Sequence, residues 1–269
     1  MIRRPAVAGQ FYPADPERLR SELIASTQDG APSPRPRALA ILVPHAGYMY
    51  SGAIAGSTYA SVRLAPRAIV LGPNHTGRGE AIAVDDSSGW QTPLGQVPVD
   101  ALLSAAILED CAAARSDRAA HEREHSLEVQ LPFLQHLLGS VTIVPICVGT
   151  MHLPTLLDLG RAVASAIGRD RGDVTLVLSS DMSHYVTAGV AGTQDRAALE
   201  RVLALDPSGL HRVVLEQDIS MCGVAPVVAG LEAARRMGAT SARLVAYGHS
   251  GQVTGDDRSV VAYAGVAIT

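Results

Sequence analysis

The sequence predicts an α/β fold in which helices cover a parallel or mixed sheet. Short aliphatic or β-branched runs alternate along the chain with longer segments of helical periodicity, and several of the short runs are apolar without interruption. Uninterrupted apolar runs are typical of strands that are buried on both faces. Polar residues also gather directly after these runs, which is where open α/β sheets bind their ligands.

The elements follow one another in a regular order. A segment rich in proline and glycine, 29–37, separates the first predicted helix from the remaining chain, and we interpret it as a loop within one domain that covers 1–269. The predicted strands are 38–44, 67–72, 80–86, 141–149, 174–180, 242–248 and 259–268, and the predicted helices are 15–26, 52–62, 99–114, 125–138, 153–168, 190–204, 207–216 and 223–237.

The composition supports a packed core and excludes several kinds of chemistry. Of the 269 residues, 47% are hydrophobic and 18% are charged, which is enough apolar surface for a large core. All 22 basic residues are arginines, so a Schiff-base lysine and the lysine of a P-loop are both excluded. The net charge of −4 does not favour a nucleic-acid partner.

The cysteines and the N-terminal segment predict a cytoplasmic location. The three cysteines form no CxxC pair, so we expect neither a disulfide framework nor a four-sulfur zinc site. Pro5 and Gly9 come before any apolar run long enough for a signal peptide, and polar residues interrupt the uncharged stretch between Arg37 and Arg63. We therefore expect a soluble protein without a membrane partner.

Histidines follow several predicted strands. His45, His75 and His184 each lie within a few residues of a strong strand, so we expect at least two of them to share one site. Asp181 precedes His184 in the segment SSDMSHY. The pair could be a base with its orienting carboxylate or a metal-binding pair, and the alternative is an aspartate that caps a helix beside an exposed histidine.

The segment HEREH at 121–125 matches the HExxH pattern of zinc metalloproteases. That chemistry requires both histidines on one helix, whereas the residues before His121 offer a poor apolar face and a better helix begins after His125. We therefore expect a charged loop that leads into a helix, with His121 not a metal ligand. Glu124 and His125 could still be presented to a site by that helix start.

Cys222 opens a predicted helix, where the helix dipole favours a thiolate. A reactive or metal-binding role is one interpretation, and an inert buried cysteine is the other. For Cys111, within a helical pattern, and Cys147, within a strand, we expect the inert role. No GxSxG, GxGxxG or P-loop motif occurs in the chain.

Several motifs together resemble one family. The segments RPAVAGQFYPAD, VPHAGYMYSG, LGPNHTG, EHSLEVQLPFL, VPICVG, SSDMSHY, MCGVAPV and YGHSG occur in this order between about residues 3 and 267. They resemble the Memo family, known in prokaryotes as AmmeMemoRadiSam system protein B. That family is similar in fold to the class III extradiol dioxygenases, so the resemblance implies a three-layer α/β/α sandwich around a mostly parallel or mixed central sheet.

The resemblance also implies a metal site. By motif, His45, His75 and Cys222 correspond to the metal ligands of the family, and Asp181 and His184 lie beside the metal. A thiolate then stands where the dioxygenases have a carboxylate, so one mononuclear ion is expected, with iron(II) favoured and copper or zinc possible. The residues expected to line the pocket around it are His125, Glu124, Tyr50, Asn74 and Phe11.

The predicted function is that of a metal-dependent redox enzyme, an oxidoreductase with a dioxygenase-like fold and a small-molecule substrate. His184 would transfer protons and Asp181 would orient it. The alternative is a non-catalytic adaptor that captures an anionic group or a peptide, for which Arg3, Arg4 and Arg78 are the nearest candidate partners. The resemblance further implies possible partners, namely an AMMECR1-type protein and a radical SAM enzyme.

Overall fold

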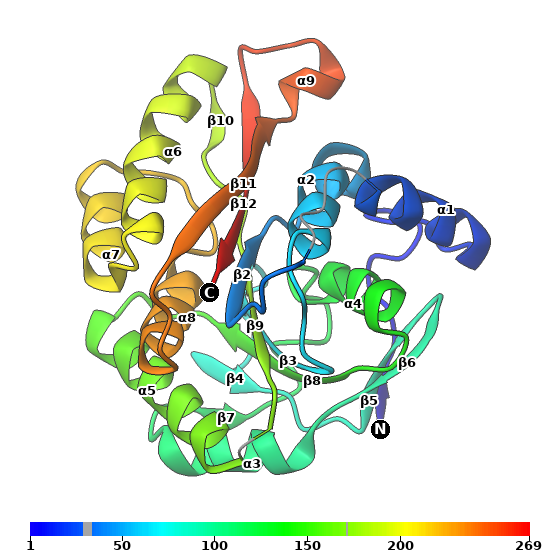
Figure 1. Ribbon diagram of the computed structural model, residues 1–269, viewed down its shortest axis with the longest axis vertical. Helices are drawn as coiled ribbons and strands as arrows, with labels where there is room; N and C mark the ends of the chain where they lie inside the picture. The colour runs from blue at the N-terminus through cyan, green and yellow to red at the C-terminus, as the bar shows by residue number, and fades with distance from the viewer. Residues whose placement is uncertain (29–33, 171) are drawn as a thin grey trace.

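The computed structural model describes residues 1–28, 34–170 and 172–269. Residues 29–33, the first part of the predicted loop 29–37, lie outside the described residues. The chain forms a nine-stranded sheet, a separate three-stranded sheet, and helices on both faces of the larger sheet (Figure 1). Within the described ranges, no helix combines the length and the apolar character needed to cross a membrane.

Four adjacent parallel strands form the centre of the larger sheet. In spatial order they are β2 (Ala40–Val43), β9 (Thr175–Ser179), β3 (Arg67–Pro73) and β8 (Thr142–Val148). Antiparallel strands extend the sheet on both sides, and the sheet is therefore mixed. These outer strands are β12 (Val260–Ile268), β11 (Ala242–His249) and β10 (His184–Val186) beyond β2, and β4 (Ile82–Val84) and β7 (Arg115–Ser116) beyond β8.

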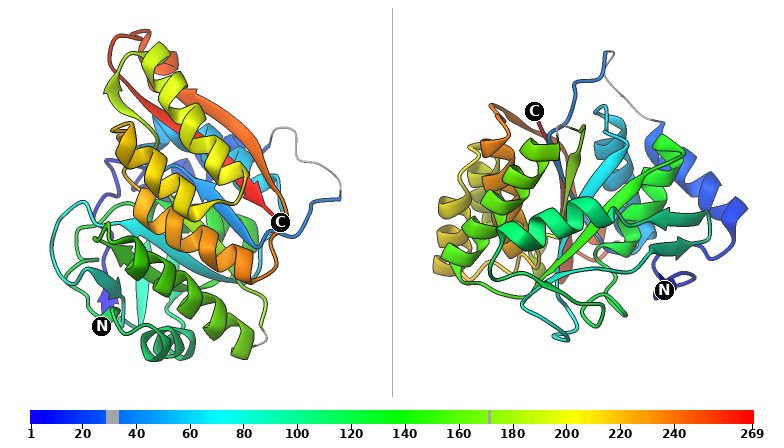
Figure 2. Two further views of the ribbon diagram at one scale, coloured as in Figure 1. Left: turned by 90° about the vertical axis from the view of Figure 1, so that its left-hand side faces the viewer. Right: turned by 90° about the horizontal axis from the view of Figure 1, so that it is seen from below.

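Alternate residues of the central strands belong to two different cores, as the strand geometry requires. Ala40 and Leu42 of β2 pack in one core, whereas Ile41 and Val43 pack in the other. Figure 2 shows the helices in two layers with the sheet between them. The helices over the first core are α3 (Ala101–Asp110), α5 (Leu153–Asp170), α6 (Ala188–Leu203), α7 (Pro207–Glu216) and α8 (Val224–Arg236). The helices over the second core are α1 (Pro16–Thr27), α2 (Tyr48–Ala60) and α4 (Leu131–Leu138). The predicted three-layer sandwich is confirmed.

Two predicted helices are shorter than expected. The helix predicted over 99–114 begins after its N-cap Asp100 and ends at Asp110, because Cys111 is extended. The helix predicted over 125–138 is divided into a 3-10 turn, η1 (Glu128–Gln130), and α4. Pro132 lies in the first turn of α4, where a missing backbone N–H costs little.

The sequence analysis missed the three-stranded sheet and a short helix. That sheet consists of β1 (Ile2–Arg3), β5 (Gly89–Thr92) and β6 (Gly95–Pro98), and the helix is α9 (Gly251–Thr254). The strands are too short to show a period. The sheet buries Trp90 completely, so it extends the second core.

Candidate metal centre

The sheet topology brings three polar segments to one place. His45 follows β2, Asp181 follows β9 and His75 follows β3, and these three parallel strands are neighbours in the order β2, β9, β3. The carboxyl ends of neighbouring parallel strands meet at one edge of a sheet. Residues separated by more than 130 positions therefore become adjacent, as the 2.7 Å hydrogen bond from the backbone N–H of His45 to Asp181 Oδ1 shows.

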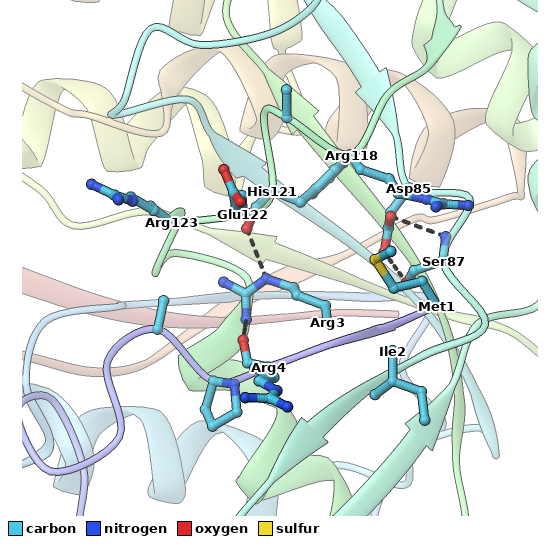
Figure 3. Close-up of a pocket in the computed structure, with 13 residues that line it drawn as sticks. Met1, Ile2, Arg3, Arg4, Asp85, Ser87, Arg118, His121, Glu122 and Arg123 are labelled. Carbon is cyan, nitrogen blue, oxygen red and sulfur yellow. Dashed lines mark hydrogen bonds between the residues drawn. The ribbon is translucent and has the colours of Figure 1, made fainter.

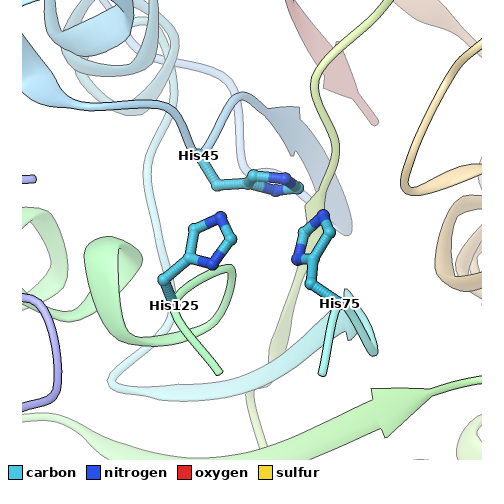
Figure 4. Close-up of side chains that lie close together, drawn as sticks. All are labelled: His45, His75 and His125. Carbon is cyan, nitrogen blue, oxygen red and sulfur yellow. The ribbon is translucent and has the colours of Figure 1, made fainter. Parts of the chain in front are cut away.

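Three imidazoles converge at this edge of the sheet. His45, His75 and His125 each offer one ring nitrogen, and these three atoms all lie within 4.8 Å of one another. The rings of His75 and His125 are stacked with their centroids 4.5 Å apart, and the ring of His45 stands edge-on to both (Figure 4). Sequence reasoning placed His125 in the pocket but did not select it as a ligand.

Glu124 lies beneath two of the imidazoles and forms hydrogen bonds with one of them, His75. Its buried carboxylate lies 2.9 Å from His75 Nδ1 and 3.4 Å from His125 Nδ1, and it accepts a hydrogen bond from the backbone N–H of His75 at 2.7 Å. A carboxylate at one ring nitrogen directs the other ring nitrogen to a metal, which is the usual arrangement around a metal-ligating histidine. The Nε2 atom of His75 is thereby left for a ligand, whereas the contact of Glu124 with His125 is not a hydrogen bond.

His45 lies between a hydroxyl group and a thiol. Its Nδ1 is 2.9 Å from Ser179 Oγ, and its Nε2 is 3.2 Å from Cys222 Sγ. Cys222 immediately precedes the N-cap of α8. Among the described residues, the group of donors that could hold a metal is therefore His45, His75 and His125. Of the ligands implied by the family resemblance, the two histidines belong to this group, whereas Cys222 contacts His45 but is not a member of it.

Burial disfavours the charged form of two of the imidazoles. It lowers the pKa of His45 well below its usual value, and it lowers the pKa of His125 to about 4 although Glu124 acts in the opposite direction. Burial alone would raise the pKa of Glu124, but hydrogen bonding and charge from His75 outweigh it and hold that pKa at about 2. At neutral pH the cluster therefore combines the carboxylate of Glu124 with neutral imidazoles at His45 and His125, and the neutral imidazole is the form in which histidine binds a metal.

The thiol of Cys222 differs from the sequence-based expectation. Its position at a helix start predicted a lowered pKa, but burial and the neighbouring charge of Asp181 raise it. A helix dipole contributes about 1 kcal/mol at such a position, which burial in a low-dielectric environment readily exceeds. The side chain is therefore a neutral thiol until a cation stabilises the thiolate.

The expected pairing of Asp181 with His184 is replaced by other contacts. His184 Nδ1 lies 2.8 Å from the carbonyl oxygen of Ser220, and the backbone N–H of His184 donates to Ser220 Oγ. Asp181 instead accepts the N–H of His45, and burial raises its pKa to about 6. Because a carbonyl only accepts, His184 carries its hydrogen on Nδ1, and Ser220 rather than Asp181 orients the ring.

A pocket of about 670 Å³ opens over the cluster. Of the predicted site residues, Phe11, His45, Tyr50, His75, His125, Asp181, His184 and Cys222 line it. Glu124 lies beneath the lining and is fully buried. Asn74 does not line this pocket, because its side chain closes the turn that follows β3 by donating to the carbonyl of Arg78 and accepting from the N–H of Gly77.

His121 lines a different pocket, of about 910 Å³ (Figure 3). Residues 121–123 form a turn and residues 124–125 are irregular, so this segment is not a helix, as expected from the weak apolar face before it. The ring of His121 is buried, with Nε2 3.1 Å from the carbonyl of Ala83. Arg3 crosses this pocket but is already bound to the carbonyls of His121 and Glu124 and to the carboxylate of Glu128.

Several further residues at the site were not predicted from the sequence, among them two serines and two tyrosines. Ser179 and Ser220 contact His45 and His184, and Tyr185 and Tyr263 line the pocket. Tyr185 has a φ of 57° at a bulge between β10 and β12, and its side chain is 80% exposed. Ser179 lies within a strand, where a buried hydroxyl was the only available signal, whereas Ser220 is exposed in the loop before α8 and no local pattern indicated it.

The fold and the site together define an α/β/α protein with a candidate metal centre at the carboxyl ends of its parallel strands. Residues 3–267 match the family described as Memo-like protein, and the chain belongs to that family.

Several curated relatives match nearly the whole chain. A MEMO1 family protein of Aquifex aeolicus is 41% identical and the match covers 98% of both chains. A MEMO1 family protein of Methanothermobacter thermautotrophicus is 40% identical, and the match covers 98% of this chain and 99% of that protein. A MEMO1 family protein of Methanopyrus kandleri is 39% identical, and the match covers 99% of this chain and 98% of that protein. Among solved structures, an uncharacterized protein from Escherichia coli K12 has a TM-score of 0.59 at 16% identity, covering 85% of this chain and 99% of its own, which shows a common fold.

Proposed function

We propose that this protein is a mononuclear metal-dependent oxidoreductase that acts on a small molecule. The observation that carries the proposal is the convergence of His45, His75 and His125 at one end of the sheet, with Cys222 in contact with His45. The donor set fits a transition metal, because imidazole suits iron, copper and zinc, and a thiolate adds affinity for softer ions such as copper(I). In this proposal His45, His75 and Cys222 are ligands and His125 adds a further nitrogen donor.

Iron(II) is the ion that we favour, and copper is the second candidate. Either ion would supply one-electron chemistry when bound. The protein contributes a pocket of about 670 Å³ large enough for a small substrate beside the cluster. Phe11 packs at 4.7 Å from the ring of His125 and forms part of the apolar wall.

His184 is the proposed acid–base group. The carbonyl of Ser220 holds its Nδ1–H, so the unprotonated Nε2 can accept a proton from a substrate hydroxyl or amine. Tyr185 and Tyr263 line the same pocket and are placed to contact a bound molecule.

The alternative of an anion-binding adaptor has less support. No arginine is present among the described residues that line the pocket. Arg3 is paired with Glu128, and Arg78 is paired with Glu122. A pocket that contains the carboxyl group of Asp181 and has no arginine among its described lining residues offers an anion no strong partner.

The proposal is tested by anaerobic purification, metal analysis and an oxygen-consumption screen with small reductants. We expect metal-dependent oxygen uptake with turnover that falls by about 10²-fold or more in His184→Ala. His152→Ala is the matched control, since His152 is an exposed histidine that pairs with Thr155 outside the pocket. Tight binding of an anionic peptide without turnover by the metal-loaded protein would instead favour the adaptor.

A further inference from the structure

Ser179 is a buried hydroxyl group at the end of β9, in contact with the ring nitrogen of His45 that faces away from Cys222. The distance from Ser179 Oγ to His45 Nδ1 is 2.9 Å, and Ser179 is fully buried. Either atom could donate in this contact, and the direction decides which nitrogen of His45 carries the hydrogen. The neighbours of Ser179 settle that direction.

The side-chain amide of Gln130 has one possible orientation. One of its terminal atoms lies 2.9 Å from the carbonyl of Pro44 and also 2.9 Å from Ser179 Oγ. A carbonyl can only accept, so this atom is the nitrogen, and the amide oxygen accepts from the hydroxyl of Tyr59 on the other side. Gln130 therefore donates a hydrogen bond to Ser179.

The single hydroxyl hydrogen of Ser179 is also assigned. Ser179 Oγ lies 2.6 Å from the carbonyl oxygen of Ser126, which can only accept. The hydrogen of Ser179 points to that carbonyl, and its oxygen accepts from Gln130. The remaining neighbour, His45 Nδ1, must then be a donor.

We propose that Ser179, held by Gln130 and the carbonyl of Ser126, is a positioning residue that fixes His45 as the Nδ1–H tautomer. The Nε2 lone pair then faces the cluster, across from the rings of His75 and His125 (Figure 4). The hydroxyl is neutral, so it fixes the tautomer without adding a charge beside a completely buried ring. His75 obtains the same result from the carboxylate of Glu124. The consequence for metal affinity rests on the proposed metal site, whereas the tautomer itself does not.

The tautomer is measured in metal-free wild-type protein with ¹⁵N-labelled histidine, from long-range ¹⁵N–¹H correlations assigned with His45→Gln. We expect His45 to carry its hydrogen on Nδ1. A His45 ring protonated on Nε2 would overturn the inference, and this measurement requires no variant of Ser179.

The effect on the site is measured with Ser179→Ala. Without the hydroxyl acceptor, we expect both tautomers of His45 in the spectrum and an affinity for zinc(II), measured by chelator competition, that is about 10- to 100-fold weaker. Ser104→Ala is the matched control, because Ser104 is also buried but its hydroxyl has no hydrogen-bond partner among the described residues. An unchanged tautomer and affinity in Ser179→Ala would refute the positioning role. A wild-type protein that binds no metal would instead contradict the proposed function. The tautomer of His45, measured in metal-free protein, would still confirm or refute the inference about Ser179.

Discussion

Replacing Glu124 by glutamine should destabilise the protein although the change is isosteric. One carboxylate oxygen of Glu124 accepts from His75 Nδ1 and from the N–H of Ser126, and the other accepts from the N–H of His75. An amide has only one oxygen, so in either orientation its NH₂ group faces at least one buried donor.

The magnitude follows from these contacts. A buried donor left without a partner costs about 1–3 kcal/mol, and charge-assisted hydrogen bonds contribute about 1.5–3 kcal/mol each. The pKa gives a similar figure, since a decrease from 4.5 to about 2 corresponds to about 3 kcal/mol. We therefore expect Glu124→Gln to lower the free energy of unfolding by about 2–4 kcal/mol at pH 7.

The assay is urea denaturation of the metal-free protein at several pH values. Because the folded pKa of Glu124 lies below the unfolded value, its stabilisation is present above pH 4.5 and is lost as the pH falls towards 2. Between pH 4.5 and about 2, the free energy of unfolding of the wild type should fall with decreasing pH more steeply than that of the variant, by up to about 1.4 kcal/mol per pH unit.

The control for this prediction is Glu122→Gln. Glu122 makes an exposed ion pair with Arg78, so the same substitution there should cost less than about 1 kcal/mol. If Glu124→Gln and Glu122→Gln had equal stability at pH 7, Glu124 could not be the buried acceptor described above.

Three other substitutions give separate tests. Cys222→Asp should weaken copper(I) binding more than iron(II) binding in anaerobic competition, because oxygen is a harder ligand than sulfur, and an unaltered preference would exclude Cys222 as a ligand. Asp181→Asn should raise the free energy of unfolding at pH 8 by up to about 3 kcal/mol. The pKa of Asp181 is raised from 3.8 to about 6 in the folded protein, so its charged form destabilises the fold above that pH. A larger gain in the free energy of unfolding at pH 4 than at pH 8 would contradict this. Gly230→Ala should cost about 1–3 kcal/mol in denaturation, since a Cβ would lie 2.0 Å from Leu178, whereas Gly192→Ala, with open space around it, should not destabilise α6.

The arrangement of the sheet could be predicted where hydrophobic patterns were long. The apolar runs of β2, β3, β8 and β9 predicted strands buried on both faces of a parallel or mixed sheet, and the rule for strand ends placed His45 and His75 at the ends of two of them. The sheet formed by β1, β5 and β6 could not be predicted, because its strands are two to four residues long. Its stability depends on the burial of Trp90, a tertiary effect that no local period shows.

At the site, residue types could be predicted but hydrogen-bond partners could not. The sequence identified His184 and Asp181 from their motif, but the partner of His184 is Ser220, which is 36 positions away. Ser179 and Gln130 lie inside predicted elements and would be expected to pack in a core or face solvent. Their polar character amid apolar neighbours was the only available signal, and the direction of their hydrogen bonds depends on the folded chain.

The metal content of three proteins purified anaerobically with added iron(II) tests the central claim most directly. Wild type should bind one ion per chain, His75→Ala should lose it, and His121→Ala should retain it, because His75 points into the cluster whereas His121 lines another pocket. Loss of stoichiometric metal in His121→Ala with retention in His75→Ala would contradict the account.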